Sequence, residues 1–409
     1  MTRRGTTRPA RAATFLRVAS LALTVVIAGC SGPILANEPA GRGTGPSPTP
    51  TAARPSDPIP IRLPADDGPH HRLTEWWYYT GHLTDPSNRR FGFEYVVFRA
   101  ERGSFPVSWA SHLAITDEDG HAFHYAQRSV VGPSVDRSAG LGAPGFDLSL
   151  GPPDAPAVGS GATVPGTAAV DSAVAAAWSM TGGDGHDRLT AATTPAEAAA
   201  AGSAGGLGLD LALAATKPPV LHDDDGWIDF GQAGGSYYYS RTALSATGHL
   251  TVAGETLDVS GTAWFDHQWG DFIAVGDGGW DWFAINLADG TDLTLSLVRA
   301  ADGSYPLVYG TLVDDAGQSR HLDRSAFTVT ATGTWRSPAT GAQYPSGWVV
   351  VVPGEALRIE LTPTVADQEL DTRATTGVVY WEGSQVVRAT RAGSALGGQA
   401  YVELTGYGP

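Results

Sequence analysis

The sequence predicts an all-β protein built from two antiparallel β domains in tandem. Only 17% of its 409 residues are charged, whereas 52 are glycine and 28 are proline. This balance favours short strands and turns, because surface helices need many charged side chains on their wet faces. From about residue 59 onward, short alternating or aromatic runs are separated by Asp, Asn and Gly, which is typical of strands joined by tight turns.

The strand pattern occurs twice, which indicates two copies of one β domain. The copies lie roughly two hundred residues apart, which is too long a period for a solenoid repeat, and two copies are too few for a propeller. The segments 91–100, 111–128, 291–300 and 309–322 are the clearest strands or hairpins. The matched pairs are Trp76 with Trp280, Tyr78 with Trp282, Tyr79 with Phe283, Leu83 with Leu287, Arg99 with Arg299, Asp117 with Asp314, and Gly120 with Gly317.

Each copy is predicted to close into an up-and-down barrel. Sandwiches fit the same pattern, but aromatic residues crowd both faces of these strands, as expected where one face lines a pocket and the other packs on a neighbouring domain. We expect an N-terminal domain at 59–245 and a C-terminal domain at 246–409. The alanine-rich region 151–206 is either long loops with weak strands or includes one short helix, with Thr194 as cap, Pro195 in the first turn and Gly202 as stop.

Residues 1–29 have the features of an export signal. Five arginines precede a short apolar run, Val18 to Ala28, which is too brief to span a bilayer. The run ends in Ile27-Ala28-Gly29-Cys30, a pattern typical of lipoprotein processing, in which Cys30 becomes the acylated N-terminus. An uncleaved anchor or an ordinary signal peptide are the alternatives. Residues 30–58 are rich in Pro, Gly, Ser and Thr and are predicted to be a flexible tether. Export followed by lipidation of Cys30 would place the protein on the extracytoplasmic face of the cell membrane.

Charge and missing motifs exclude several function classes. The net charge of −16 argues against nucleic-acid binding and against electrostatic docking on anionic lipid, so membrane contact is expected only through the lipid on Cys30. Cys30 is the only cysteine, so no disulfide can form within the chain. The sequence has no Gly-x-Ser-x-Gly elbow and no glycine-rich phosphate loop.

The aromatic run "EWWYY" is the first candidate site. In a strand, Glu75, Trp77 and Tyr79 point to one side, and Trp76 and Tyr78 point to the other. A carboxylate against aromatic rings has its pKa raised by desolvation, which suits proton donation. The alternative is an acid at the barrel rim that is bonded to a neighbouring strand or paired with an arginine.

The second candidate is "WFDHQWGDF", residues 264–272. In a regular strand, His267 and Trp269 share one face and Asp266 lies on the other. A histidine can move a proton near neutral pH, an adjacent acid can orient it, and an indole face can stabilise a cation. The alternative is a strand end whose polar groups tie the domains together.

The remaining polar candidates are weaker. Asp281 lies between two tryptophans and faces either a cavity or the domain junction, so it is a candidate substrate contact or a core hydrogen-bonding group. His70, His71, His112 and His124 are each expected to be structural. Their spacings match no common zinc site, and the sequence predicts no metal.

Four blocks resemble the AttH-type lipocalin-like proteins, which include the bacterial carotenoid 1,2-hydratases. The blocks are "EWWYYTGHL", "WFDHQWGDF", "WDWFAINLADG" and "GVVYWEG…GQAYVELTGY", and the likeness runs from Asp66 to Tyr407. The resemblance implies two lipocalin-like (calycin) barrels packed together. It also implies cofactor-free addition of water to an isolated double bond of a hydrophobic substrate. The hydratases' His-x-Trp pair maps onto His267 and Trp269, whereas their downstream Tyr and Asp have no match near Thr294 and Ser296.

Two classes of function follow. The first is a cofactor-free hydratase, or a related lyase or cyclase, that acts on an isoprenoid or polyketide-like molecule. Asp266 and His267 would then be the proton-handling pair with Glu75 as a second acid, while the apolar wall would consist of Trp77, Tyr79 and Trp269. The second is a non-catalytic carrier of a lipophilic ligand at the cell surface.

Overall fold

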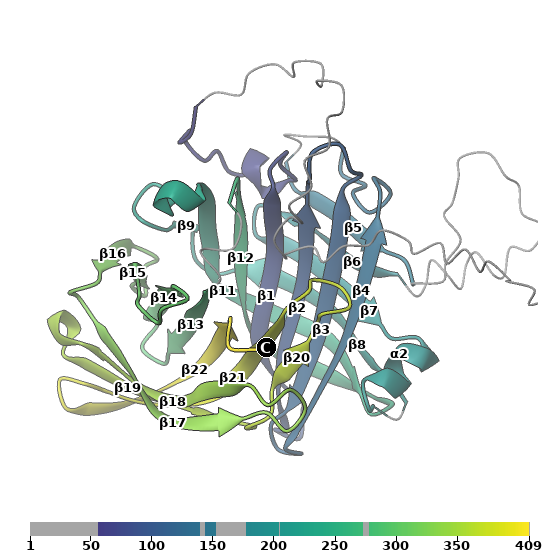
Figure 1. Cartoon of the computed structure of the whole chain (residues 1–409). Coiled ribbons are helices and arrows are strands. Elements are labelled where there is room, and N and C mark those ends of the chain that lie inside the picture. Colours follow the sequence, from purple (N-terminus) through teal and green to yellow (C-terminus); the bar gives the residue numbers. More distant parts are fainter. Residues whose placement is uncertain (1–55, 140–143, 153–176, 204, 273–277, 409) are drawn as a thin grey trace, which may run out of the picture. The chain divides into compact units, whose positions relative to one another are not determined.

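The computed structural model describes residues 56–139, 144–152, 177–203, 205–272 and 278–408. The predicted signal peptide, Cys30 and most of the tether lie outside these ranges. In the described part of the chain, no helix is long and apolar enough to cross a membrane. Almost all regular structure here is β-strand, as predicted (Figure 1).

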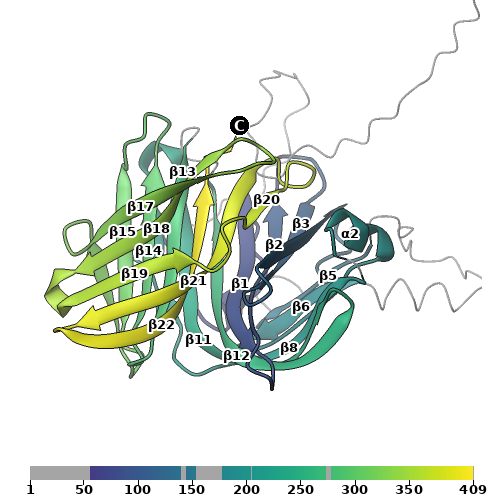
Figure 2. The same cartoon turned by 90° about the horizontal axis from the view of Figure 1, so that it is seen from below.

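The first sheet curls into a nearly closed barrel (Figure 2). Its strands run in the order β4-β3-β2-β1-β12-β11-β8-β7-β6-β5, and β9 and β10 pair with β11. The bounds are β1 Thr74–Thr84, β2 Arg90–Ala100, β3 Ser108–Asp117, β4 Ala122–Val131, β5 Phe146–Leu150, β6 Trp178–Gly183, β7 His186–Ala192, β8 Leu207–Ala215, β9 Val220–Leu221, β10 Trp227–Asp229, β11 Gly235–Val252 and β12 Glu255–Gly270.

The second sheet is a half-barrel with the order β16-β15-β14-β13-β22-β21-β19-β18-β17, and β20 pairs with β21. Its edge strand β17 presents mostly exposed polar residues to solvent. The bounds are β13 Gly279–Leu287, β14 Asp292–Arg299, β15 Leu307–Val313, β16 Ser319–Asp323, β17 Thr328–Arg336, β18 Gln343–Val352, β19 Leu357–Pro363, β20 Glu369–Asp371, β21 Val379–Arg391 and β22 Ser394–Thr405. Short 3-10 turns are η1 Ala65–Asp67, η2 Gly231–Ala233 and η3 Pro353–Glu355.

The internal repeat is visible in the topology. In each sheet the first strand begins a meander and also pairs with the last strand of its own copy, β1 with β12 and β13 with β22. The prediction of two tandem lipocalin-like domains is therefore confirmed, with the second open on one side. The expected boundary at 245/246 falls inside β11, so the two sheets divide after Gly270 instead. Pairing between first and last strands leaves no local sequence signal, which explains the displacement.

A buried arginine bridges the seam of the barrel between β4 and β5. Arg128 donates to the carbonyl of Leu150 at 3.1 Å and pairs with Glu197 at 2.6 Å. Its guanidinium group lies 4.4 Å from the ring centre of Trp178. Glu197 belongs to α2, Pro195–Ala200, where it forms a capping box with Thr194. This helix matches the predicted one, and its acid is used to hold the barrel closed.

The two sheets pack through one face of β1, β2 and β12 against β13, β21 and β22. An aromatic cluster lies between them, including Tyr78, Trp264 and Trp282. Buried hydrogen bonds also cross this interface, such as Tyr78 Oη to Glu382 at 2.8 Å and Tyr380 Oη to Glu94 at 3.0 Å. The opposite face of β1 and β12 contributes to the apolar core inside the barrel.

Candidate functional site

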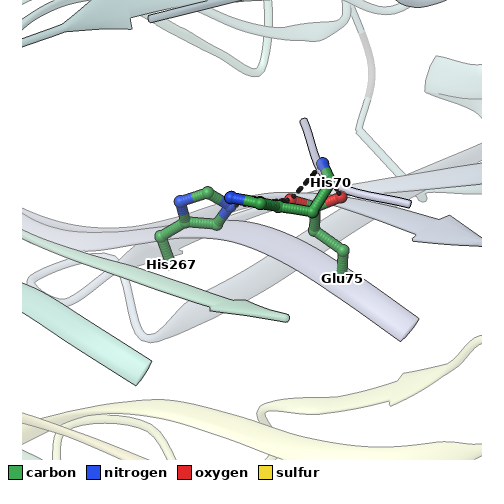
Figure 3. A group of neighbouring side chains, drawn as sticks. All are labelled: His70, Glu75 and His267. Carbon is green, nitrogen blue, oxygen red and sulfur yellow. Dashed lines mark hydrogen bonds and ion pairs between the residues drawn. The ribbon is translucent and has the colours of Figure 1, made fainter. Parts of the chain in front are cut away.

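The pairing of β1 with β12 brings Glu75 and His267 together inside the barrel. Trp77 pairs with His267 and Glu75 pairs with Trp269, so Glu75 and His267 are diagonal neighbours on one face. The Nε2 atom of His267 lies 3.0 Å from Oε1 of Glu75, and both side chains are fully buried (Figure 3). The alternation expected within each strand is observed, with Glu75 beside Trp77 and His267 beside Trp269. The pairing of β1 with β12, which the sequence left open, joins these two faces.

His70 completes this group, which we call the barrel-end cluster (His70, Glu75 and His267). The Nδ1 atom of His70 lies 2.8 Å from Oε1 of Glu75, and its backbone N–H donates to Oε2 at 2.9 Å. The ring stacks on Trp269 with centroids 4.1 Å apart. Sequence reasoning treated His70 as an isolated structural residue, because it precedes the strand and no local spacing links it to His267.

The cluster holds Glu75 as a carboxylate. Burial alone raises the pKa of Glu75, but the charge of His70 and hydrogen bonds from both imidazoles outweigh it and lower the pKa to about 2. Burial lowers the pKa of His70, yet the charges of Glu75 and Asp66 raise it overall. The expectation of a raised pKa at Glu75 was wrong, because the two imidazoles were missing from the argument. Glu75 is therefore suited to accept hydrogen bonds and not to donate a proton.

Asp266 lies on the other side of the same strand. It accepts hydrogen bonds from Tyr238 Oη at 2.7 Å, from Trp264 Nε1 at 2.7 Å and from the hydroxyl of Ser240. Because neighbouring residues of β12 point to opposite faces, the structure separates Asp266 from His267. The predicted proton-handling pair is not formed.

Asp266 faces an apolar space between the two sheets, which we call the interface hollow. It consists of two adjoining parts with volumes of about 90 and 210 Å³ that share Trp76, Phe98, Phe272, Trp280, Val298 and Glu403. The part of about 90 Å³ is also lined by Tyr78, Tyr238, Trp282 and Ser296. Together the two parts reach the lower end of the size range of small-molecule pockets.

Glu403 of β22 is the second acid of the interface hollow. Its Oε2 atom accepts a hydrogen bond from Trp280 Nε1 at 2.8 Å. Desolvation raises its pKa to about 7 despite this bond, with a contribution from the charge of Asp266. Desolvation also raises the pKa of Asp266, to about 6, against three donated hydrogen bonds. Sequence reasoning missed Glu403, although it alternates with Tyr401 in the block "AYVELTGY".

Two further acids lie behind Glu403. Glu382 pairs with Glu403 across β21 and β22, and Glu94 is bonded to Tyr380. Burial raises the pKa of Glu94 to about 8 and the pKa of Glu382 well above its usual range, with repulsion from Glu403 adding to both. These groups therefore keep their protons at neutral pH.

The other predicted residues lie outside the interface hollow. Trp77, Tyr79 and Trp269 are buried in the core of the barrel, where Trp77 stacks on His267 and Tyr79 on Phe265. They therefore do not form its wall, and the alternate residues Trp76 and Tyr78 line it instead. Asp281 faces the concave side of the half-barrel. There it accepts a hydrogen bond from Tyr407 Oη at 2.8 Å and lines an open groove of about 650 Å³.

Comparison with known proteins decides the family. The profile of the AttH-like family matches residues 54–407. The chain belongs to the AttH-like family. A crystal structure from Nitrosomonas europaea assigned to AttH is 29% identical with a TM-score of 0.68, and the match covers 85% of this chain and 98% of that one. No curated protein sequence matches the chain.

A second solved structure shows how widely the AttH-like fold occurs. Kievitone hydratase from Nectria haematococca is 15% identical with a TM-score of 0.60, and the match covers 85% of this chain and 93% of that one. At this identity the likeness concerns the fold. In this AttH-like chain, Ser296 lines the interface hollow, and the two acids of the hollow, Asp266 and Glu403, come from β12 and β22.

Proposed function

We propose that this AttH-like protein is a cofactor-free hydratase, or a related lyase or cyclase, whose substrate binds in the interface hollow. The substrate class is a hydrophobic isoprenoid or polyketide-like molecule with an isolated double bond. The observation that carries the proposal is the placement of Asp266 and Glu403 in one aromatic-lined space. A family fold shared with a hydratase is consistent with this reading.

The two acids have surroundings suited to different roles. Three donors stabilise the charged form of Asp266, whereas Glu403 accepts a hydrogen bond from Trp280. With pKa values of about 6 and about 7, Asp266 is mostly ionised at neutral pH and Glu403 keeps much of its proton. Glu403 is therefore the general acid and Asp266 the general base.

The proposed reaction balances without a cofactor. The proton of Glu403 adds to one alkene carbon, and the faces of Trp76 and Trp280 stabilise the cation that forms on the other. Water adds to this cation as Asp266 takes its proton. The turnover leaves the proton on Asp266 and the charge on Glu403, and proton exchange through solvent restores the starting state.

Product analysis in isotopically labelled water tests this proposal. The protein is incubated with a panel of acyclic terpenoids in H₂¹⁸O, and we expect a product that has gained one labelled water molecule. Glu403→Gln and Asp266→Asn should each lower the rate by roughly 10²-fold or more. Asp281→Asn is the matched control, because its carboxyl group also has a pKa of about 6 but faces the groove of the half-barrel. If only Asp281→Asn loses activity, the reaction takes place in the groove of the half-barrel and not in the interface hollow.

A carrier of a lipophilic ligand is the second candidate, favoured by the apolar lining of the interface hollow. Ligand binding should quench the fluorescence of Trp76 and Trp280, which line both of its parts. Saturable quenching without any product in the labelled-water assay would refute the enzyme and support the carrier.

We further propose that the protein is lipid-anchored through Cys30 on the extracytoplasmic face of the cell membrane. The lipobox-like ending of residues 27–30 supports this proposal. Cys30→Ala should release the protein from the membrane fraction and abolish labelling by a palmitate analogue. Unchanged membrane association in this variant would refute it.

A further inference from the structure

We propose that the barrel-end cluster is a binding site for one divalent transition-metal ion, with zinc as the best match. The cluster lies inside the barrel, on the opposite face of β12 from the interface hollow, so it is a separate site. Sequence spacing predicted no metal here, because His70 precedes β1 and His267 lies on β12.

Three metal-ligand donors converge in this cluster. His70 Nδ1 and His267 Nε2 both approach the same carboxylate oxygen of Glu75, at 2.8 and 3.0 Å. One donor atom from each residue can be chosen so that all three lie within 4.8 Å of one another. Donors around tetrahedral zinc, bound at about 2.0–2.2 Å, lie roughly 3.3 Å apart. Side-chain adjustments of a few tenths of an ångström up to about an ångström would therefore admit the ion.

The donor set indicates which metal fits. Two imidazoles and one carboxylate form the His₂Glu combination that holds zinc in open sites, whereas magnesium and calcium prefer oxygen ligands throughout. Three protein ligands leave the fourth position to water. A cavity of about 50 Å³ lined by Asp66, His70 and Trp269 adjoins the cluster and offers both an entry path and room for that water.

Neighbouring residues can orient the ligands. His70 Nε2 lies 3.5 Å from Asp66 Oδ1, the arrangement in which a second carboxylate fixes the tautomer of a metal-bound imidazole. The backbone N–H of His70 contacts both carboxylate oxygens of Glu75, Oε2 at 2.9 Å and Oε1 at 3.1 Å, and Oε1 also faces the two rings. His267 Nε2 donates to the Glu75 carboxylate in this structure, so binding an ion through Nε2 requires its proton to move to Nδ1. Among the described residues, His267 Nδ1 has no hydrogen-bond partner.

The aromatic surroundings limit how the rings can move. Trp269 stacks on His70 and Trp77 stacks on His267, with centroids 4.1 and 4.7 Å apart. The donors are thus held on a rigid pair of strands, with His70 as the one ligand from the preceding segment. An ion bound here would tie that segment to the barrel.

Metal titration of the full-length protein tests the proposal. After treatment with a chelator, calorimetry with Zn²⁺ should show one site per chain, and Mg²⁺ should give no comparable binding. X-ray absorption should show nitrogen and oxygen ligands at about 2.0–2.1 Å with an imidazole signature. His70→Ala and His267→Ala should each weaken zinc binding by at least tenfold. His249→Ala is the control, since His249 is an exposed histidine paired with Asp258 at 2.9 Å.

Each outcome decides the matter. Loss of stoichiometric binding in the two cluster variants but not in His249→Ala supports the site. Absence of zinc binding by the wild type, or unchanged binding in His70→Ala and His267→Ala, overturns it and leaves a purely hydrogen-bonded triad. If His267→Ala does not fold, zinc binding by His70→Ala tests the site. This variant should fold, because His70 is partly exposed and precedes the strand. None of these results depends on turnover in the interface hollow.

Discussion

Replacing Glu403 with glutamine should change how the stability of the protein depends on pH. The pKa of Glu403 is raised from 4.5 to about 7 in the folded protein. Its contribution to stability is therefore fully present below about pH 4.5 and is lost as the pH rises through 7. One pKa unit corresponds to 1.36 kcal/mol, so the loss is at most roughly 3 kcal/mol. Because the side chain of Glu403 is only partly buried, we expect about 2 kcal/mol.

Urea unfolding at several pH values measures this difference. The free energy of unfolding of Glu403→Gln minus that of the wild type should rise by about 2 kcal/mol between pH 4.5 and 8. Glu255→Gln is the control, because Glu255 is an exposed acid in a surface ion pair and should change the curve little. If the curves of the wild type and Glu403→Gln stay parallel across this range, the carboxyl group titrates normally and cannot be the proposed acid.

Three further predictions concern the barrel seam, the acid and the helix cap. Arg128→Ala should lower the free energy of unfolding by about 3–5 kcal/mol, because it leaves the partly buried carboxylate of Glu197 unpaired. The control Arg188→Ala removes one side of an exposed ion pair and should cost less than about 1 kcal/mol. Chemical denaturation of both variants measures the difference. Trp280→Phe removes the N–H that stabilises the charged form of Glu403, so the pKa of Glu403 should rise. The alkaline limb of the pH–rate profile should then move to higher pH. An unmoved limb would contradict the assignment of Glu403 as the general acid. Thr194→Ala should cost about 1 kcal/mol in thermal unfolding through loss of the capping box.

The sequence was sufficient for the fold because the signals involved are local. Alternation, turn residues and the cap at Thr194 are each encoded within a few residues, and the strands and α2 follow them closely. The pairing of the internal repeat predicted two copies, and β1 and β13 do begin equivalent meanders. Which strand ends each copy depends on contacts between residues far apart in sequence. The domain boundary was therefore placed too early.

The candidate site was predicted only in part, for a related reason. Alternation correctly placed Glu75 on the face of Trp77, and His267 on the opposite face of β12 from Asp266, but it left open whether Glu75 and His267 meet. It could not show that His70 would fold back onto Glu75, and so the direction of the pKa shift was wrong. Nor could it show that β22 brings Glu403 to the same space as Asp266, since that depends on how the two sheets pack.

The alternation of β1 and β12 also has a consequence for sequence change in this family. In each of these strands, one set of alternate residues points to the barrel-end cluster and the other set points to the interface hollow. If the C-terminal half of β1 keeps its register, inserting or deleting a single residue near the middle of the strand would exchange the two sets before that point. Trp76 would then face the barrel and Glu75 the interface aromatics. No point substitution within the strand can restore both faces. Length changes should thus be tolerated in the connecting loops and selected against within β1, so that the two sites are inherited together.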